Sequence, residues 1–90
     1  MSGIGDKVMR AKMQVQSVMR TEYGEKITMN AVAKDTAYPT DGSDEDNTFA
    51  KFSPSASFEL TCTNPALFGA INPGERFYLD FTRAPDKAKA

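Results

Sequence analysis

The chain has 90 residues, of which 40% are hydrophobic and 26% are charged, and its formal net charge is −1. A chain of this length buries only about 60% of its unfolded surface, so residues 1–90 are expected to form a single small β-rich domain. No apolar run approaches the roughly 20 residues that span a bilayer, which argues against a membrane protein. The N-terminus lacks the basic start and apolar stretch of a secretory signal, which favours the cytoplasm.

The sequence contains no histidine and a single cysteine, Cys62. Without histidine the usual general base, the Cys-His and Ser-His pairs and most zinc sites are missing. A lone cysteine excludes an internal disulfide, and Cys62 alternates with Phe58 and Leu60 as a small buried apolar residue does. We therefore expect a protein that is not an enzyme and that has no catalytic residue, cofactor or metal ligand.

The first half of the chain begins with residues 1–8, which we expect to be a flexible tail. Residues 10–20 fit two patterns. With a period of two, Ala11, Met13 and Val15 share one face, as in a half-buried strand. With a period of 3.6, a helical stripe is formed by Ile4, Val8, Ala11, Val15 and Val18.

The segment that follows favours the strand. Residues 21–25 resemble a short connection in which Gly24 is free to adopt a positive φ. Beyond it, Ile27, Met29, Ala31 and Ala33 alternate with polar residues. Two alternating segments joined by a short loop with a glycine are typical of a β-hairpin.

Charge is segregated along the chain. Residues 1–34 carry six basic and three acidic side chains, whereas residues 35–48 carry five acidic side chains and no basic one. The acidic segment does not fit a calcium-binding EF-hand loop, since Asp46 stands where the loop that starts at Asp41 needs glycine. We expect residues 35–48 to be a solvated, mobile acidic loop.

The C-terminal half contains the clearest alternation. Residues 56–63 and 76–83 are predicted strands, and we expect them to supply the core through Phe58, Leu60, Phe77, Leu79 and Phe81. Between them, Asn64 and Pro65 have the character of a helix N-cap and first helical residue, which predicts one short helix near 65–71. Residues 84–90 form a polar tail.

These elements predict a mainly β (or α+β) fold, either a small twisted antiparallel sheet or a partly open barrel. Their order, with a short helix before the last strand, matches an OB-like arrangement, although nothing after Thr82 alternates as a fifth strand does. An incomplete barrel leaves a sheet edge exposed, and such edges are often covered by another subunit. A homo-oligomer is therefore expected.

Three segments carry a resemblance to a known group: residues 21–26, 49–65 and 73–82. In order and spacing they resemble small uncharacterised proteins encoded by tailed bacteriophages and prophages, over about residues 10–83. The resemblance implies a phage origin, a β-rich fold, and the cytoplasm of the host cell or the virion as location. It transfers no catalytic residue.

We considered three functions. The favoured one is a non-enzymatic phage-type accessory or structural protein that acts through protein–protein contacts, with itself or with a larger phage assembly. The second is binding of single-stranded nucleic acid, because Tyr78 alternates away from the apolar residues beside basic side chains. The residues assigned to that interface are Arg76, Tyr78, Arg83, Lys12 and Arg20. The third is an accessory protein that binds a small molecule or nucleotide in a pocket between subunits.

Overall fold

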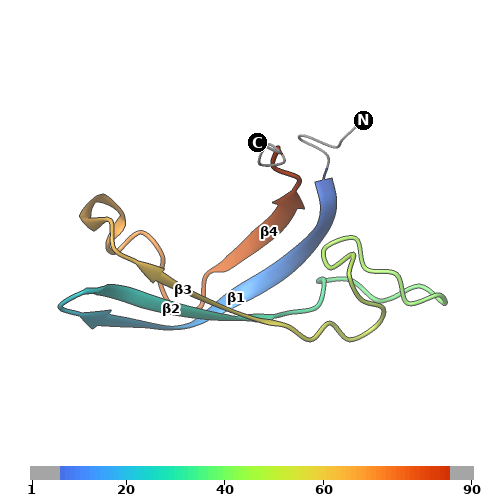
Figure 1. Ribbon diagram of the computed structural model, residues 1–90. Coiled ribbons are helices and arrows are strands. Elements are labelled where there is room, and N and C mark those ends of the chain that lie inside the picture. The colour runs from blue at the N-terminus through green and yellow to red at the C-terminus, as the bar shows by residue number, and fades with distance from the viewer. Residues whose placement is uncertain (1–6, 86–90) are drawn as a thin grey trace.

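A computed structural model describes residues 7–85, which form one antiparallel sheet of four strands (Figure 1). The elements in chain order are β1 (Lys7–Thr21), β2 (Gly24–Ala31), β3 (Ser57–Cys62), the 3-10 turn η1 (Pro65–Leu67) and β4 (Arg76–Thr82). Across the sheet the order is β3-β2-β1-β4, so that β3 and β4 form the two edges. The mainly β class is confirmed. The sheet is open, and the alternative of an OB-like barrel does not form.

The predicted hairpin is confirmed as a strand pair, with β1 pairing with β2 from Thr21 opposite Gly24. The register shifts between Val15 and Ser17. This bulge explains why residues 10–20 also fit a helical stripe, because it brings Val18 onto the same face as Val15. Lys7 belongs to β1, which corrects the expected tail at residues 1–8. The remainder of both expected tails, residues 1–6 and 86–90, lies outside the described residues.

The core lies on one face of the two central strands. Its buried apolar side chains are those of Ala11, Met13, Val15, Ile27 and Met29. The expected core residues lie beside it: Phe58, Phe77 and Leu79 are partly buried and pack against it. Leu60 and Phe81, however, are 41% and 49% exposed. That part of the prediction is wrong, because both side chains lie on edge strands at positions that no other part of residues 7–85 covers.

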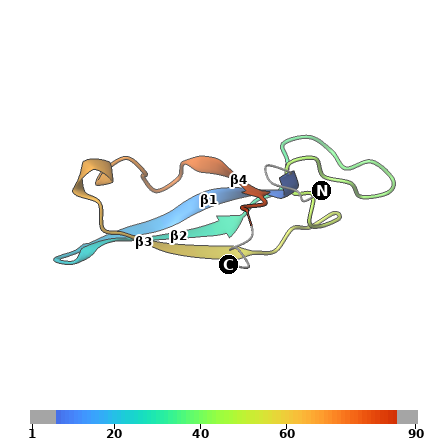
Figure 2. The ribbon, with the colours of Figure 1, turned by 45° about the horizontal axis from the view of Figure 1, so that its top comes forward.

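The segment between β3 and β4 runs from one edge of the sheet to the other (Figure 2). It passes the hairpin end of the apolar face, where the Gly69 N–H donates to the Glu25 carboxylate (3.1 Å) and Ile71 packs against the core. Asn64 caps η1 as predicted, accepting a hydrogen bond from the Ala66 N–H. The helix expected near 65–71 is shorter, since it is only the single turn Pro65–Leu67 and Gly69 already has a φ of +85°.

The acidic loop differs from expectation, because its last part is fixed to β1. Asn47 is fully buried, and its Oδ1 accepts the Lys12 N–H (2.8 Å) while its Nδ2 donates to the Val32 carbonyl (2.8 Å). Thr48 exchanges two hydrogen bonds of 2.9 Å with the Arg10 main chain. Because β2 ends at Ala31, residues 47–48 take its place beside β1 and satisfy the main chain there.

Candidate functional site

Three of the five residues assigned to a nucleic-acid interface lie together on the face opposite the core. Lys12 is paired with Tyr78 across β1 and β4, and Gln14 is paired with Arg76. Arg10 faces Asp80 in the same register. Since side chains alternate between the two faces of a sheet, these even-numbered residues share one face and the core residues share the other.

Lys12 is buried and bound to two carboxylates of the acidic loop. Its Nζ lies 3.1 Å from Asp35 Oδ2 and 3.5 Å from Asp46 Oδ2. Arg76 Nη1 lies 3.2 Å from the other oxygen of Asp35. The hydrogen bond from Lys12 lowers the pKa of the Asp35 carboxyl below its ordinary value, and the same bond raises the pKa of Lys12. Asp35 therefore bridges two predicted site residues.

Tyr78 is half-exposed, and its ring and hydroxyl both have charged partners. Its O–H donates to Asp46 Oδ1 (3.1 Å), a bond that raises the pKa of Tyr78, with burial adding to the rise. The guanidinium of Arg10 lies 4.2 Å from the centre of the ring. Arg10 also donates from Nε and Nη2 to the two oxygens of Asp80, at 2.7 and 3.1 Å, and this lowers the pKa of Asp80.

We call this group of side chains the charged cluster; it consists of Arg10, Lys12, Arg76, Tyr78, Asp35, Asp46 and Asp80. Sequence reasoning missed Arg10 and Asp80, although their even positions place them in line with Lys12 and Tyr78. It also missed the two loop carboxylates. The signal for them was the charge segregation itself, because an acidic segment that follows a basic one is a natural partner for it.

The other two predicted residues lie outside the charged cluster. Arg20 stands eight residues beyond Lys12 on β1, about 26 Å away in an extended strand. There its Nε donates to Glu25 (3.0 Å), and its guanidinium lies 4.9 Å from the centre of the Phe68 ring. Arg83 follows the last residue of β4 and is exposed. The structure thus does not gather all five residues into one interface.

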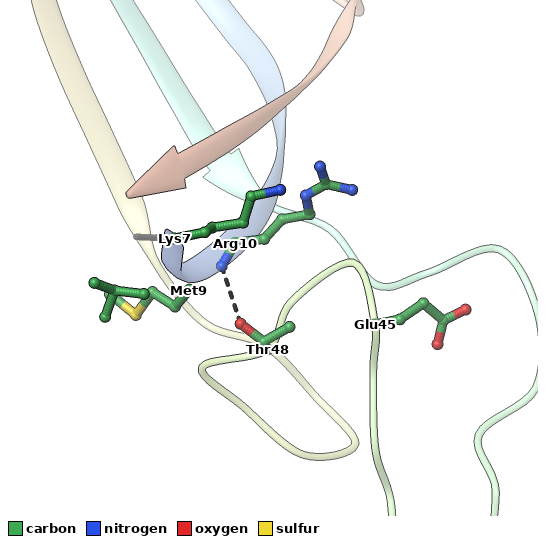
Figure 3. Close-up of a pocket in the computed structure, with 6 residues that line it drawn as sticks. Lys7, Met9, Arg10, Glu45 and Thr48 are labelled. Carbon is green, nitrogen blue, oxygen red and sulfur yellow. Dashed lines mark hydrogen bonds between the residues drawn. The ribbon is translucent and has the colours of Figure 1, made fainter. Parts of the chain in front are cut away.

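Next to the charged cluster is a depression of about 380 Å³, shown in Figure 3. Its lining comes from the start of β1 and from the acidic loop, including Lys7, Arg10, Glu45 and Thr48. Figure 3 shows the hydrogen bond from the Arg10 N–H to the Thr48 hydroxyl (2.9 Å), which joins the two segments that line the depression. Within residues 7–85, no group of three or more His, Cys, Asp or Glu side chains is placed to hold a metal ion.

The opposite face carries an apolar groove of about 120 Å³. β1 supplies Met9, Ala11 and Met13, and β4 supplies Leu79 and Phe81. The remaining lining residues come from β3 and the two segments that precede it, namely Phe49, Ala56, Ser57 and Phe58. No lining side chain is ionisable, so the groove suits apolar side chains rather than a charged ligand.

Comparison with protein families, with curated proteins and with solved structures gives no match. The resemblance to phage-encoded proteins therefore stays a prediction. In the part of the chain that the structure describes, no helix has the length and apolar character needed to cross a membrane. A function must therefore be argued from the face that carries the charged cluster and from the face that carries the apolar groove.

Proposed function

We propose that this protein acts without catalysis, through protein–protein contact, and that copies of the chain associate through the apolar groove. The observation that carries this proposal is that, within residues 7–85, no second layer lies over the groove. The molecule measures 48 × 41 × 16 Å, which is the thickness of a single sheet with its loops. A sheet with one apolar face normally buries that face against a second element.

The described residues cover only part of the apolar face. The segment between β3 and β4 covers the hairpin end, whereas Phe81 at the groove remains 49% exposed. We propose that a second polypeptide supplies the apolar surface that covers the groove.

A second copy of the chain suits the groove for two reasons. The net charge of −1 leaves little repulsion between copies, and the groove itself carries no ionisable side chain. In addition, its volume is below the roughly 300–1,000 Å³ of small-molecule pockets, so it accepts side chains such as the half-exposed Phe81 of another copy.

The size of the contact sets its strength. Four strands about 4.8 Å apart and about five residues long give an open face of roughly 330 Å², or about 650 Å² for two facing copies. Stable complexes usually bury about 1,200–2,000 Å² in total. We therefore expect a reversible dimer whose population rises with protein concentration.

Sedimentation velocity over a wide range of protein concentration tests this proposal. The wild-type chain is expected to shift from monomer to dimer, and Phe81→Ser is expected to remain monomeric at concentrations where the wild type is dimeric. Tyr23→Ser is the matched control, because Tyr23 is a more exposed aromatic residue (78%) at the hairpin turn, outside the groove. A wild-type chain that stays monomeric throughout, or an equal loss of dimer in both variants, contradicts the proposal.

The accessory or structural role in a phage belongs to the same proposal. It is supported by residues 21–26, 49–65 and 73–82, which resemble phage-encoded proteins. The partner in that role would be a larger phage assembly. Self-association through the groove is compatible with it, since assembly proteins act as repeated copies.

A further inference from the structure

The Asp35 carboxylate holds two cations from neighbouring strands. Its Oδ2 accepts from Lys12 Nζ at 3.1 Å and its Oδ1 accepts from Arg76 Nη1 at 3.2 Å. The Asp35 side chain is 72% exposed, whereas that of Lys12 is only 9% exposed. An external anion therefore reaches Lys12 only by replacing Asp35. A phosphodiester has the same two-oxygen, single-charge arrangement that Asp35 presents to these cations.

We propose that Lys12 and Arg76 form a phosphate-binding site for the backbone of single-stranded nucleic acid, and that Asp35 occupies this site as an internal competitor. Tyr78 lies beside Lys12 in the pairing of β1 with β4, with half of its surface exposed. A cationic track next to an exposed aromatic ring is the combination by which single strands are bound without sequence preference.

The charge of the cluster explains why Asp35 blocks the site. The three cations Arg10, Lys12 and Arg76 face the three carboxylates Asp35, Asp46 and Asp80. These six charges cancel, and Lys7, whose Nζ lies 4.0 Å from Asp80 Oδ1, leaves this surface only weakly positive, so that it attracts phosphate weakly. When Asp35 leaves, the cluster gains one net positive charge, Arg76 loses its carboxylate partner, and Lys12 keeps only its contact with Asp46 Oδ2 at 3.5 Å.

Asp35 is also the carboxylate whose departure disturbs the fold least. Both of its side-chain hydrogen bonds go to the two cations. The loop is fixed to β1 further along, by Asn47 and Thr48. Asp46, in contrast, adjoins this anchor and is only 16% exposed. Asp35 therefore swings away without breaking the attachment of the loop.

Fluorescence anisotropy with a labelled single-stranded oligothymidylate at low salt tests the proposal. Asp35→Asn removes one charge a few ångströms from the phosphate position, and we expect it to bind about ten-fold more tightly than the wild type. Asp41→Asn is the matched control, because it makes the same change in net charge in the same loop. Asp41 bonds to the Ser43 N–H (3.0 Å) and lies outside the charged cluster. Its affinity should equal that of the wild type.

Two further measurements complete the test. Adding Arg76→Gln to Asp35→Asn should abolish the gain in affinity, and the affinity of Asp35→Asn should fall steeply with added salt. No gain in Asp35→Asn, an equal gain in Asp41→Asn, or a gain that survives Arg76→Gln overturns the proposal. Inorganic phosphate that binds Asp35→Asn as tightly as the oligonucleotide does overturns the assignment to nucleic acid. None of these results depends on the self-association of the chain.

Discussion

Replacing Asn47 by alanine is expected to destabilise the protein strongly, because one buried side chain joins the acidic loop to two segments of main chain. Its Oδ1 accepts the Lys12 N–H, and its Nδ2 donates to the Val32 carbonyl and to Asp44 Oδ2 (3.2 Å). Alanine fills none of these roles. The Lys12 N–H on β1 and the Val32 carbonyl just after β2 then lose their partner, at a place where the Asn47 side chain is fully buried.

The magnitude follows from the two main-chain groups. A buried polar group that loses its partner costs about 1–3 kcal/mol, so two such groups reduce the free energy of unfolding by roughly 2–4 kcal/mol once some water enters. For a domain of this size each kcal/mol lowers Tm by about 4–8 °C, which predicts a fall of roughly 10–30 °C. The loss is a large share of the roughly 5–13 kcal/mol expected for 90 residues.

Thermal unfolding followed by circular dichroism measures this effect, with Asn30→Ala as the control. Asn30 lies exposed on β2, so the same substitution there should change the free energy of unfolding by no more than about 0.5 kcal/mol. A loss below about 1 kcal/mol for Asn47→Ala, or equal shifts in the two variants, would refute the role of Asn47 as the anchor of the loop.

Two other predictions concern the hairpin and the loop. Gly24→Ala should destabilise the protein by more than Gly74→Ala in chemical unfolding, because the new Cβ would lie 2.4 Å from the Cys62 carbonyl oxygen, whereas at Gly74 it meets nothing within 4 Å. Both glycines have positive φ, +149° at Gly24 and +89° at Gly74, so both variants carry backbone strain and only Gly24→Ala adds the clash; equal losses would argue against it. For Asp44, burial raises the pKa, but the hydrogen bonds from Asn47, Asp46 and Tyr38 outweigh it and leave the pKa below the ordinary 3.8. A carboxyl whose pKa is lower in the folded than in the unfolded chain stabilises the fold at any pH above its unfolded-state pKa. This stabilisation is lost as the pH falls through its folded-state pKa. Asp44→Asn should therefore be less stable than the wild type at pH 7, and it should lose less stability than the wild type when the pH falls below about 4. Urea unfolding of both proteins at pH 7 and below pH 4 measures this. An equal loss on acidification in the wild type and in Asp44→Asn would contradict the reasoning.

Sequence patterns predicted the strands because each pattern depends on neighbouring residues. The alternation of Ala11, Met13 and Val15, followed by Gly24 and the alternation from Ile27, identified the hairpin and its turn. The predicted strand at residues 56–63 is observed as β3, Ser57–Cys62. Alternation assigns a side chain to a face of the sheet, and the outward orientation of Tyr78 followed from it.

The same patterns did not reveal what covers each face. Phe81 and Leu60 alternate as well as any core residue, yet they lie on edge strands that no second layer formed by the described residues covers. Likewise, Lys12 is a basic residue on a polar face, but Asp35, 23 residues away, neutralises it. Strand order and the position of a long loop depend on contacts between distant residues, and no local spacing records them.

The groove and the charged cluster lie on opposite faces of the sheet, so the two proposals can be tested independently. Two copies that meet at their grooves stack their sheets about 10 Å apart, as packed sheets do. Their charged clusters then lie on the two outer surfaces, with both sheets between them. A single-stranded nucleic acid on one outer surface would contact the charged cluster of one protomer only. Each protomer would therefore bind nucleic acid independently of the other. Phe81→Ser should therefore weaken the proposed dimer without changing the proposed phosphate-binding site, and Asp35→Asn should raise the affinity for the oligonucleotide without changing the dimer.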